Sequence, residues 1–330
     1  MTHTHVQLEA ILARALPGER LRATESLGAR TWLLSTGERR RAVLRLPTEA
    51  DPWAGPPHEA EALALQALAA ELDSRLPALL AHEPGPAGFT LLSYLEGQPL
   101  PLMIEQLSED ERYAIGRELG GLLARVHAYA PEGYGQLQAG SRIALSRVVR
   151  EPPAETDSQP RSLRVSVDPT PSATLLTDER DQHYLITRLD AALDSAVGEG
   201  ALSAPDGARV AEWARANLAS SGQPPCLAHG DLAPERVLVR RRERGWAISG
   251  LIGWGAALAW RPSWDHVTMQ GAFAEDQYFG VRAGYGNAYD DLTERRYDQL
   301  RDFALLPYRL VLALEAELPA LALRMVEAAN

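Results

Sequence analysis

The sequence predicts an α+β fold with two lobes, a small β-rich lobe followed by a larger helical one. Short runs with β propensity, separated by turn residues, dominate the chain up to residue 96. Helical spacing of apolar residues dominates the remainder of the chain. Strands followed by helices, rather than alternating with them, are typical of the α+β class. We therefore place the N-terminal lobe at 1–96 and the helical C-terminal lobe at 97–330, with a long loop or partly ordered insertion at about 140–200.

The first lobe begins with a helix and continues with strands. Apolar residues at helical spacing predict an amphipathic helix over 6–16. Two β-type runs, 31–35 and 42–46, flank a Thr36-Gly37-Glu38 turn and predict a hairpin. A helical pattern over 58–72 and a further strand over 89–95 complete this lobe.

The second lobe begins with a well-marked helix. Ser108 and Glu111 form an S-x-x-E capping box. An apolar stripe comes next at helical spacing: Ile115, Leu119, Leu122, Leu123 and Val126. Residues 150–182 are rich in Pro, Ser, Thr, Asp and Arg without a period, which indicates a loop. Further expected elements are helices over 183–197 and 206–219, a hairpin formed by 237–239 and 246–252, and helices to the C-terminus, including 294–318.

Composition is that of an ordinary globular protein with a substantial core. Of the 330 residues, 45% are hydrophobic and 23% are charged. No apolar run approaches the roughly 20 residues that a membrane-spanning helix needs. The single cysteine, Cys226, excludes a disulfide framework and favours a reducing compartment. We expect a soluble cytoplasmic protein that contacts no membrane.

The charge of the chain argues against nucleic-acid binding. A formal net charge of -11 lacks the basic surface that displaces counterions from a phosphate backbone. Arg-rich patches at 39–41 and 240–242 lie beside expected hairpin turns, where solvated side chains are the better interpretation. All 33 basic residues are arginine, so an arginine where lysine is common carries no special meaning in this chain.

The most informative motif is His229-Gly230-Asp231, which runs into a Val-Leu-Val strand. Leu251-Ile252-Gly253-Trp254 lies on the returning strand, and Pro262-Ser263-Trp264-Asp265 comes after it. Together these segments resemble the catalytic region of the aminoglycoside phosphotransferase and choline-kinase-like family. The resemblance implies a two-lobed protein-kinase-like fold, in which Asp265 braces the catalytic loop through backbone hydrogen bonds.

The resemblance also implies the roles of several residues. Asp231 would be the base that accepts the proton of the acceptor hydroxyl; its other interpretation is a turn or helix-cap residue. Arg45 would pair with phosphate, and Glu59 would orient it, with Glu61 as the second candidate if the register differs by two. Exposed charges are the alternative. Gly28 marks the place of the nucleotide loop, where a simple turn is equally compatible, and 89–95 would be the hinge strand.

Two positions depart from the family pattern. The family holds Mg²⁺ with an asparagine and an aspartate, and this chain has Arg236 and Gly253 there. Arginine offers only donors and glycine offers no side-chain oxygen, so we expect no normal Mg²⁺ site and assign no metal ligand. The site gains two positive charge units relative to the family, formally the charge of one Mg²⁺. Arg236 would then bind an anion without metal; the alternative is a decayed site with Arg236 in solvent.

By resemblance the chain would be an ATP-dependent small-molecule O-phosphotransferase. The two substitutions favour a pseudokinase with absent or much reduced activity, whose interlobe cleft takes a small-molecule or anionic ligand, with ATP bound metal-free or with weak metal dependence. A non-catalytic scaffold for a metabolite or protein partner is the competing class. A residually active kinase is the third alternative, with Glu235 as a substitute metal ligand. The acceptor and the oligomeric state cannot be read from the sequence.

Overall fold

A computed structural model gives the fold. It describes residues 5–28, 30–37, 40–47, 57–69, 73–131, 135–137, 146–148, 164–165, 181–217, 225–243, 245–260 and 262–286, and positions 320, 323, 324 and 326. Most of the region expected to form a loop or insertion, and the helix expected over 294–318, lie outside the described residues. Among the described residues, no helix is long and apolar enough to cross a membrane.

The N-terminal lobe is built on one antiparallel sheet with the strand order β1-β2-β3-β5-β4. Its strands are β1 (Leu21–Gly28), β2 (Thr31–Thr36), β3 (Arg41–Arg45), β4 (Leu79–Glu83) and β5 (Phe89–Ser93). The hairpin expected over 31–46 is confirmed, since β2 and β3 pair in register from Thr31 opposite Arg45 to Ser35 opposite Arg41. β1, which the sequence analysis did not identify, is exposed along most of its length and so has no apolar alternation.

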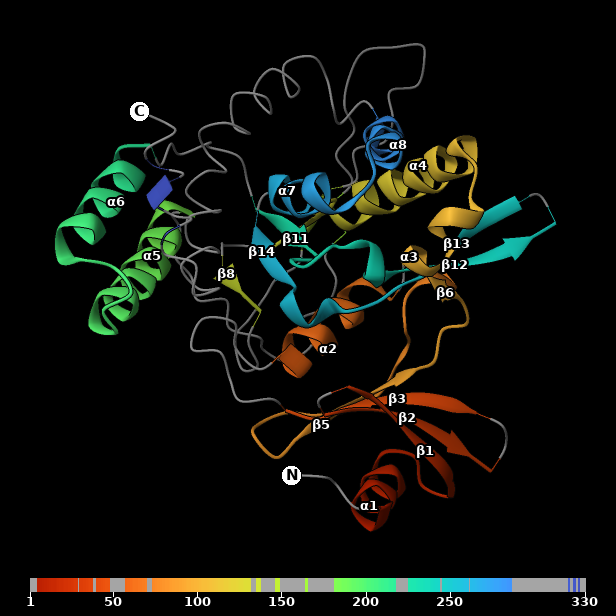
Figure 1. The fold of residues 1–330 in the computed structure, drawn as a ribbon. Helices are drawn as coiled ribbons and strands as arrows, with labels where there is room; N and C mark the ends of the chain where they lie inside the picture. The colour runs from red at the N-terminus through yellow and green to blue at the C-terminus, as the bar shows by residue number, and fades with distance from the viewer. Residues whose placement is uncertain are drawn as a thin grey trace.

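The two helices of this lobe cover opposite faces of the sheet (Figure 1). α1 (His5–Ala15) packs Leu8 and Leu12 against a cluster that includes Leu91 of β5. α2 (Pro57–Leu68) lies on the other face, and its core cluster includes Leu92. Adjacent residues of a strand point to opposite faces, which explains why one strand serves both cores. The cluster around α2 continues into the C-terminal lobe, so α2 joins the two parts.

The central helix of the C-terminal lobe is α4 (Glu109–Val126). Its capping box is confirmed: the Ser108 hydroxyl accepts from the backbone N–H of Glu111, and the Glu111 carboxylate accepts from the backbone N–H of Ser108. The predicted apolar stripe is buried throughout. The shorter elements before α4 are β6 (Gln98–Pro99), α3 (Leu100–Met103) and the 3-10 turns η1 (Asp73–Arg75) and η2 (Ile104–Gln106).

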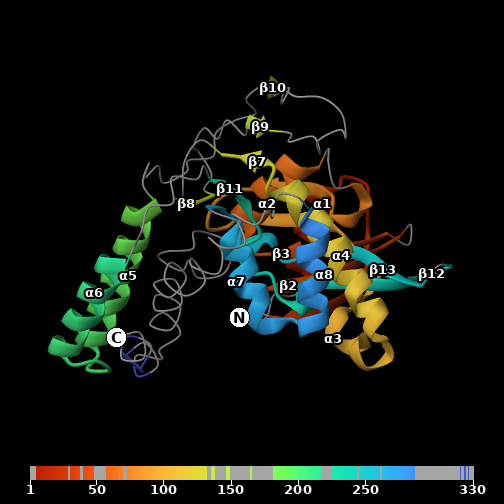
Figure 2. The same cartoon turned by 90° about the horizontal axis from the view of Figure 1, so that it is seen from above.

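α4 and α8 (Glu275–Tyr285) lie side by side in both views (Figures 1 and 2). Glycines allow the two backbones to approach closely. A Cβ on Gly120 would lie 2.1 Å from the carbonyl oxygen of Val281, and one on Gly284 would lie 1.8 Å from that of Arg117. Such distances exclude any side chain larger than hydrogen, so the helix pair is fixed by backbone contact.

Small sheets carry the loops of the site. β11 (Cys226–Ala228) pairs with β14 (Leu258–Trp260), which pairs with β8 (Gly135–Gln136). β12 (Val237–Arg242) and β13 (Gly245–Leu251) form the expected hairpin, and β6 pairs with β12. The remaining elements are β7 (Tyr129–Ala130), β9 (Ser146–Val148), β10 (Arg164–Val165), α5 (Asp181–Gly198), α6 (Ala204–Asn217), η3 (Pro234–Arg236), η4 (Trp254–Ala256) and α7 (Ser263–Ala272).

Candidate functional site

The loop that carries Asp231 is anchored by one buried carboxylate. Asp265, on the first turn of α7, accepts hydrogen bonds from the backbone N–H of His229 at 2.8 Å and of Gly230 at 2.9 Å. The indole of Trp264 donates to the carbonyl oxygen of Gly230 at 2.9 Å. The brace expected of Asp265 is present in the structure, and it fixes the loop through main-chain atoms.

Asp265 is held in turn by a histidine and a tyrosine. The Nε2 atom of His127 lies 3.0 Å from Oδ2 of Asp265, and its Nδ1 atom lies 2.6 Å from the hydroxyl of Tyr285. Burial alone would raise the pKa of Asp265, but the hydrogen bond and electrostatic interaction with His127 and the contacts to His229 outweigh burial and lower the pKa. Asp265 is therefore a charged carboxylate in the protein interior.

The loop turns sharply at Gly230. Its φ of 86° lies in the left-handed region, and a Cβ there would lie 1.9 Å from the carbonyl oxygen of Ala256. Next to it, the buried ring of His229 places Nε2 3.0 Å from the carbonyl oxygen of Ile252. Burial lowers the pKa of His229, which keeps the ring neutral and suits a role in loop geometry rather than proton transfer.

Asp231 is bonded to Arg236 in this arrangement. Oδ2 of Asp231 accepts from Nε of Arg236 at 3.1 Å and also from Nη2 of the same guanidinium. The backbone of Arg236, at the end of η3, donates to Ala233 and accepts from the N–H of Ile252. These bonds direct the Arg236 side chain across the site toward Asp231, so the solvent-facing orientation considered for a decayed site is not the one found.

Gly253 makes room for this arginine. A Cβ at Gly253 would lie 2.7 Å from Cδ and 3.0 Å from Nε of Arg236. Gly253 also has φ 88° and ψ 38°, a left-handed conformation that most side chains avoid. The stem of Arg236 therefore fills the space that a larger residue at 253 would need. The two departures from the family pattern are thus coupled, because a change at 253 affects the position of Arg236.

Arg45 is paired with a carboxylate of α2, but the partner differs from the first expectation. Nε of Arg45 lies 2.8 Å from Oε2 of Glu61, whose side chain is fully buried. Glu59 instead accepts a hydrogen bond from the backbone N–H of Gly85 at 2.7 Å, in the turn between β4 and β5. The pairing of Arg45 with Glu59 was wrong by two residues, because the sequence does not show which side of α2 faces β3.

Glu61 also connects the two lobes. Its Oε1 accepts from the backbone N–H of Trp254, 3.3 Å away and directly after Gly253. Burial raises the pKa of Glu61, while Arg45, the Trp254 N–H and the charge of Arg236 oppose that rise. One carboxylate thus links β3, α2 and the segment that carries Gly253.

The turn between β1 and β2 occupies the place expected for the nucleotide loop. Gly28 ends β1 with φ 151°, and a Cβ added there would meet no heavy atom within 4 Å. Arg30 adopts a left-handed φ of 59° and donates from its guanidinium to the carbonyl oxygen of Pro47. The turn is therefore tied to the end of β3, and Gly28 borders open space.

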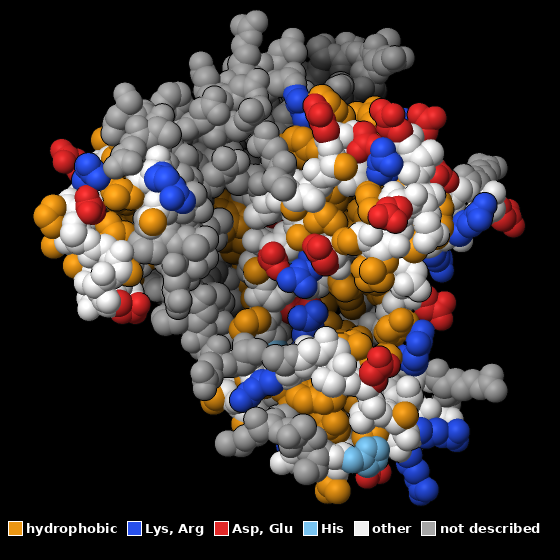
Figure 3. Space-filling model, in the orientation of Figure 1, with side chains coloured by type: hydrophobic (Ala, Val, Ile, Leu, Met, Phe, Trp, Pro, Cys, Tyr) orange, Lys and Arg blue, Asp and Glu red, His pale blue; other side chains and the backbone are white. Residues whose placement is uncertain are grey.

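Charged side chains of both signs gather at the middle of the face seen in Figure 3, between the sheet lobe and the helical lobe. Two ion pairs described above involve predicted site residues: Arg45 pairs with Glu61, and Arg236 pairs with Asp231. Among the described residues, no group of three or more His, Cys, Asp or Glu side chains could hold a metal ion.

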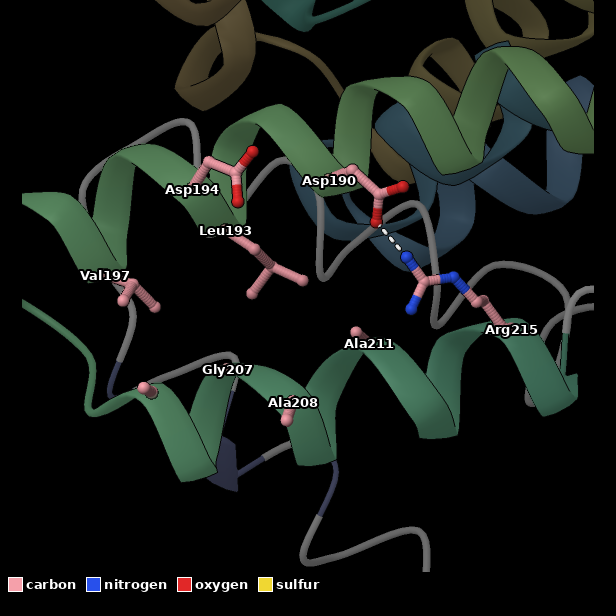
Figure 4. A pocket seen from close by; sticks show the side chains of 9 residues that line it. Asp190, Leu193, Asp194, Val197, Gly207, Ala208, Ala211 and Arg215 are labelled. Carbon is pink, nitrogen blue, oxygen red and sulfur yellow. Dashed lines mark hydrogen bonds and ion pairs between the residues drawn. The ribbon is translucent and has the colours of Figure 1, made fainter.

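A hollow lies between α5 and α6 (Figure 4). Its volume is about 440 Å³. Leu193 and Ala211 contribute apolar surface, and Arg215 forms an ion pair with Asp190 at its side. We assign it no chemistry.

Comparison with known proteins gives a family match. The sequence profile described as "Phosphotransferase enzyme family" matches residues 21–303. The chain belongs to the phosphotransferase enzyme family. The match covers the sheet lobe, the Asp231 loop, Gly253 and α8. No curated protein matches the sequence.

Solved structures with the same fold include three aminoglycoside phosphotransferases. The gentamicin complex of APH(2'')-IIa is 15% identical with a TM-score of 0.63, covering 99% of this chain and 97% of that one. ADP-bound APH(2'')-Ib is 15% identical with a TM-score of 0.60 at the same coverage. The GDP and kanamycin complex of APH(2'')-IIIa is 16% identical with a TM-score of 0.57, covering 98% of each chain. The two-lobed protein-kinase-like fold is thus confirmed for this phosphotransferase family member.

The sequence analysis missed two features of the site. One is the bond between Arg236 and Asp231, since five residues of separation across η3 give no periodic signal. The other is the role of Tyr285, whose hydroxyl contacts His127 from a helix far along the chain. Tyr285 lies 158 residues from His127, so only the folded structure brings the two side chains together.

Proposed function

We propose that this phosphotransferase family member is a pseudokinase whose interlobe cleft binds ATP or a phosphorylated metabolite without bound Mg²⁺. Phosphoryl transfer to a small-molecule acceptor is absent or greatly slowed. The observation that carries the proposal is the position of Arg236, which bonds to Asp231 and fills the space beside Gly253. Arg236 would offer a cationic charge there to a bound phosphate.

The residues around Asp231 do not fit a magnesium ion held in the family manner. Mg²⁺ needs near-octahedral oxygen ligands, usually one or two carboxylates plus phosphates and water. Gly253 supplies no side-chain oxygen, and the guanidinium of Arg236 would repel the ion. Because metal ions neutralise charge on the transferred phosphoryl group, their loss should cut turnover severely.

The phosphate partners that remain suit anion binding. The Arg45 side chain is 27% exposed beside the buried Glu61, and guanidinium groups bind phosphate oxygens through paired N–H donors. Asp231 has one carboxylate oxygen bonded to Arg236, so in this arrangement it pairs with a protein cation. ADP and GDP are bound in two of the related structures, which makes purine nucleotides the first ligands to test.

Calorimetric titration with ATP tests the proposal. We expect binding in the presence of a chelator, with no gain in affinity when Mg²⁺ is added. Tighter binding with Mg²⁺ would contradict metal-free binding. Absence of binding under both conditions would support a decayed cleft, and brisk phosphorylation of any small alcohol would contradict the pseudokinase assignment.

A double restoration, Arg236→Asn with Gly253→Asp, tests whether the rest of the catalytic machinery is intact. Gly253→Asp alone should restore little ATP hydrolysis, because the charge of Arg236 remains beside the new carboxylate and the new Cβ would lie 2.7 Å from Cδ of Arg236. The double variant removes that clash, and aspartate tolerates a left-handed backbone better than most residues. We expect Mg²⁺-dependent ATP hydrolysis to rise in the double variant above both single variants, measured as phosphate release.

A non-catalytic scaffold for a metabolite or protein partner remains the competing function. The same titrations separate it from the pseudokinase proposal, because a scaffold would give no nucleotide response. Cytoplasmic location, the absence of nucleic-acid contact and the division of lobes at residue 96 stay predictions from the sequence.

A further inference from the structure

The charge on Arg236 is already partnered before any ligand arrives. Nε and Nη2 both point at Oδ2 of Asp231, and the side chains are 39% and 47% exposed. We infer that this ion pair is an autoinhibitory latch: Asp231 competes with phosphate for Arg236, and an anionic ligand binds by displacing the carboxylate. The inference rests on the proposed metal-free binding of anions and names how that binding is regulated.

The latch depends on where the stem of Arg236 is held. Cδ and Nε lie against Gly253, and the backbone of Arg236 is bonded to Ile252. The guanidinium can therefore turn about the end of its stem, but it cannot leave the site without losing its packing. A phosphate that approaches Asp231 meets a guanidinium whose Nε and Nη2 already donate to a carboxylate, which has the same sign of charge as the phosphate. Both effects weaken binding until the pair opens.

The exposure of the pair makes such opening feasible. An ion pair between half-exposed side chains is screened by water and is worth little, even when the donors are charged. A phosphate carries more charge than a carboxylate and presents three acceptor oxygens to the same guanidinium fork. A phosphate should therefore displace the Asp231 carboxylate from Arg236 when other residues of the cleft also bind the phosphate.

A double-mutant cycle tests the latch with inorganic pyrophosphate as the probe, in chelator and without added metal. The four proteins are wild type, Asp231→Asn, Arg236→Gln and the double variant. We expect Asp231→Asn to tighten pyrophosphate binding by roughly tenfold when Arg236 is present, a difference of about 1.4 kcal/mol. In the Arg236→Gln background the same change should give no more than about a twofold gain, because only charge repulsion is removed.

The cycle distinguishes a latch from simple repulsion. Equal gains from Asp231→Asn in both backgrounds would overturn the latch and leave metal-free binding standing. A loss of affinity on Asp231→Asn would overturn it too, since Asp231 would then be orienting Arg236 for the ligand. If wild type does not bind and Asp231→Asn does, the latch stands and the proposed binding by the unmodified protein fails. If none of the four binds, both fail.

Gly253→Ala is a second way to separate Arg236 from Asp231, and it changes no charge. The new Cβ would lie 2.7 Å from Cδ and 3.0 Å from Nε of Arg236, so the side chain would have to move. We expect that movement to lengthen the bond between Nε and Asp231. We expect pyrophosphate affinity to rise in this variant as well, by a smaller factor, since the carboxylate stays charged. Unchanged or weaker binding, in a variant whose circular dichroism and melting match wild type, would contradict the latch.

Discussion

Asp265 and Glu61 are two buried carboxylates that stabilise different parts of the site. Asp265 accepts from main-chain N–H groups and from His127, and it shapes the loop that presents Asp231. Glu61 accepts from the N–H of Trp254 and pairs with Arg45, so it fixes the relation between the sheet lobe and that loop. A charge without full pairing in the interior costs several kcal/mol, so both sites should respond strongly to small changes.

Asp265→Asn should destabilise the fold by about 2–4 kcal/mol, because a neutral amide replaces the charged acceptor of two backbone N–H groups and of His127. Urea denaturation measures the loss. The matched control is Asp194→Asn on the exposed side of α5, which should change stability by no more than about 0.5 kcal/mol. Equal effects of the two changes would show that the Asp265 brace carries little energy.

Glu61→Gln and Glu59→Gln form a matched pair on one helix. Glu61→Gln leaves Arg45 without its charged partner, and we expect metal-free ADP affinity to change by a factor of about three to ten. Glu59→Gln affects the bond to Gly85 and should leave that affinity within about twofold. Titration calorimetry of both variants checks this; a larger response from Glu59→Gln would reverse the assignment of the pair.

At the scale of the elements, the helices α4 and α8 are in close backbone contact. Glycines on both helices face the backbone of the other one. The pair positions Tyr285 at the end of α8 against His127 at the end of α4, and through them Asp265. The packing of α4 against α8 is therefore connected to the geometry of the Asp231 loop through three side chains, those of Tyr285, His127 and Asp265.

Gly120→Ala should lower stability by about 1–3 kcal/mol, because its Cβ would sit 2.1 Å from the carbonyl oxygen of Val281 and the helices would have to separate. Gly121→Ala is the control on the same turn of α4. Its nearest atom beyond the helix is 3.7 Å away, and alanine favours a helix over glycine by about 1 kcal/mol. Thermal melting should therefore fall for the first variant and stay or rise for the second.

At the scale of the whole molecule, four histidines among the described residues have pKa values lowered mainly by burial: His58, His82, His229 and His266. For His266 the pKa falls to about 3. An unfolded histidine binds a proton near pH 6.5, so the folded state is at full stability above about pH 6.5 and loses stability as the pH falls. The Asp265 contribution is lost only below about pH 4, its unfolded range.

Urea unfolding from about pH 7.5 to about pH 4.5 should show this loss. His266→Phe keeps an aromatic ring beside Tyr278 and Tyr285, and it should make the fall shallower by about 1.4 kcal/mol per pH unit. His5, exposed at the start of α1, is the control whose replacement by Phe leaves the slope unchanged. An unaltered slope in His266→Phe would mean that this ring is protonated in the folded protein.

Local signals predicted much of the fold. The Ser108 capping box, the apolar stripe of α4 and the 31–46 hairpin are short-range patterns, and each is found in the structure. β1 was missed because its exposed residues do not alternate. The motif around Asp231 led to Asp265 because both lie in one family-like segment.

Features that depend on three-dimensional placement could not be predicted from the sequence. Glu59 and Glu61 lie two positions apart on a helix, and only the packing of α2 against β3 decides which one meets Arg45. The direction of the Arg236 side chain depends on the space at Gly253, a property of backbone conformation as much as of residue type. The glycine contacts of α4 and α8 likewise require both helices at once.

The anchoring of the Asp231 loop by main-chain N–H groups separates the architecture of the site from its reactivity. Asp265 binds the backbone N–H groups of His229 and Gly230, so the side chains at 231 and 236 can be exchanged while the loop keeps its form. Substitutions at these two positions can therefore convert the cleft from transferring a group to sensing one, without rebuilding the loop that carries them.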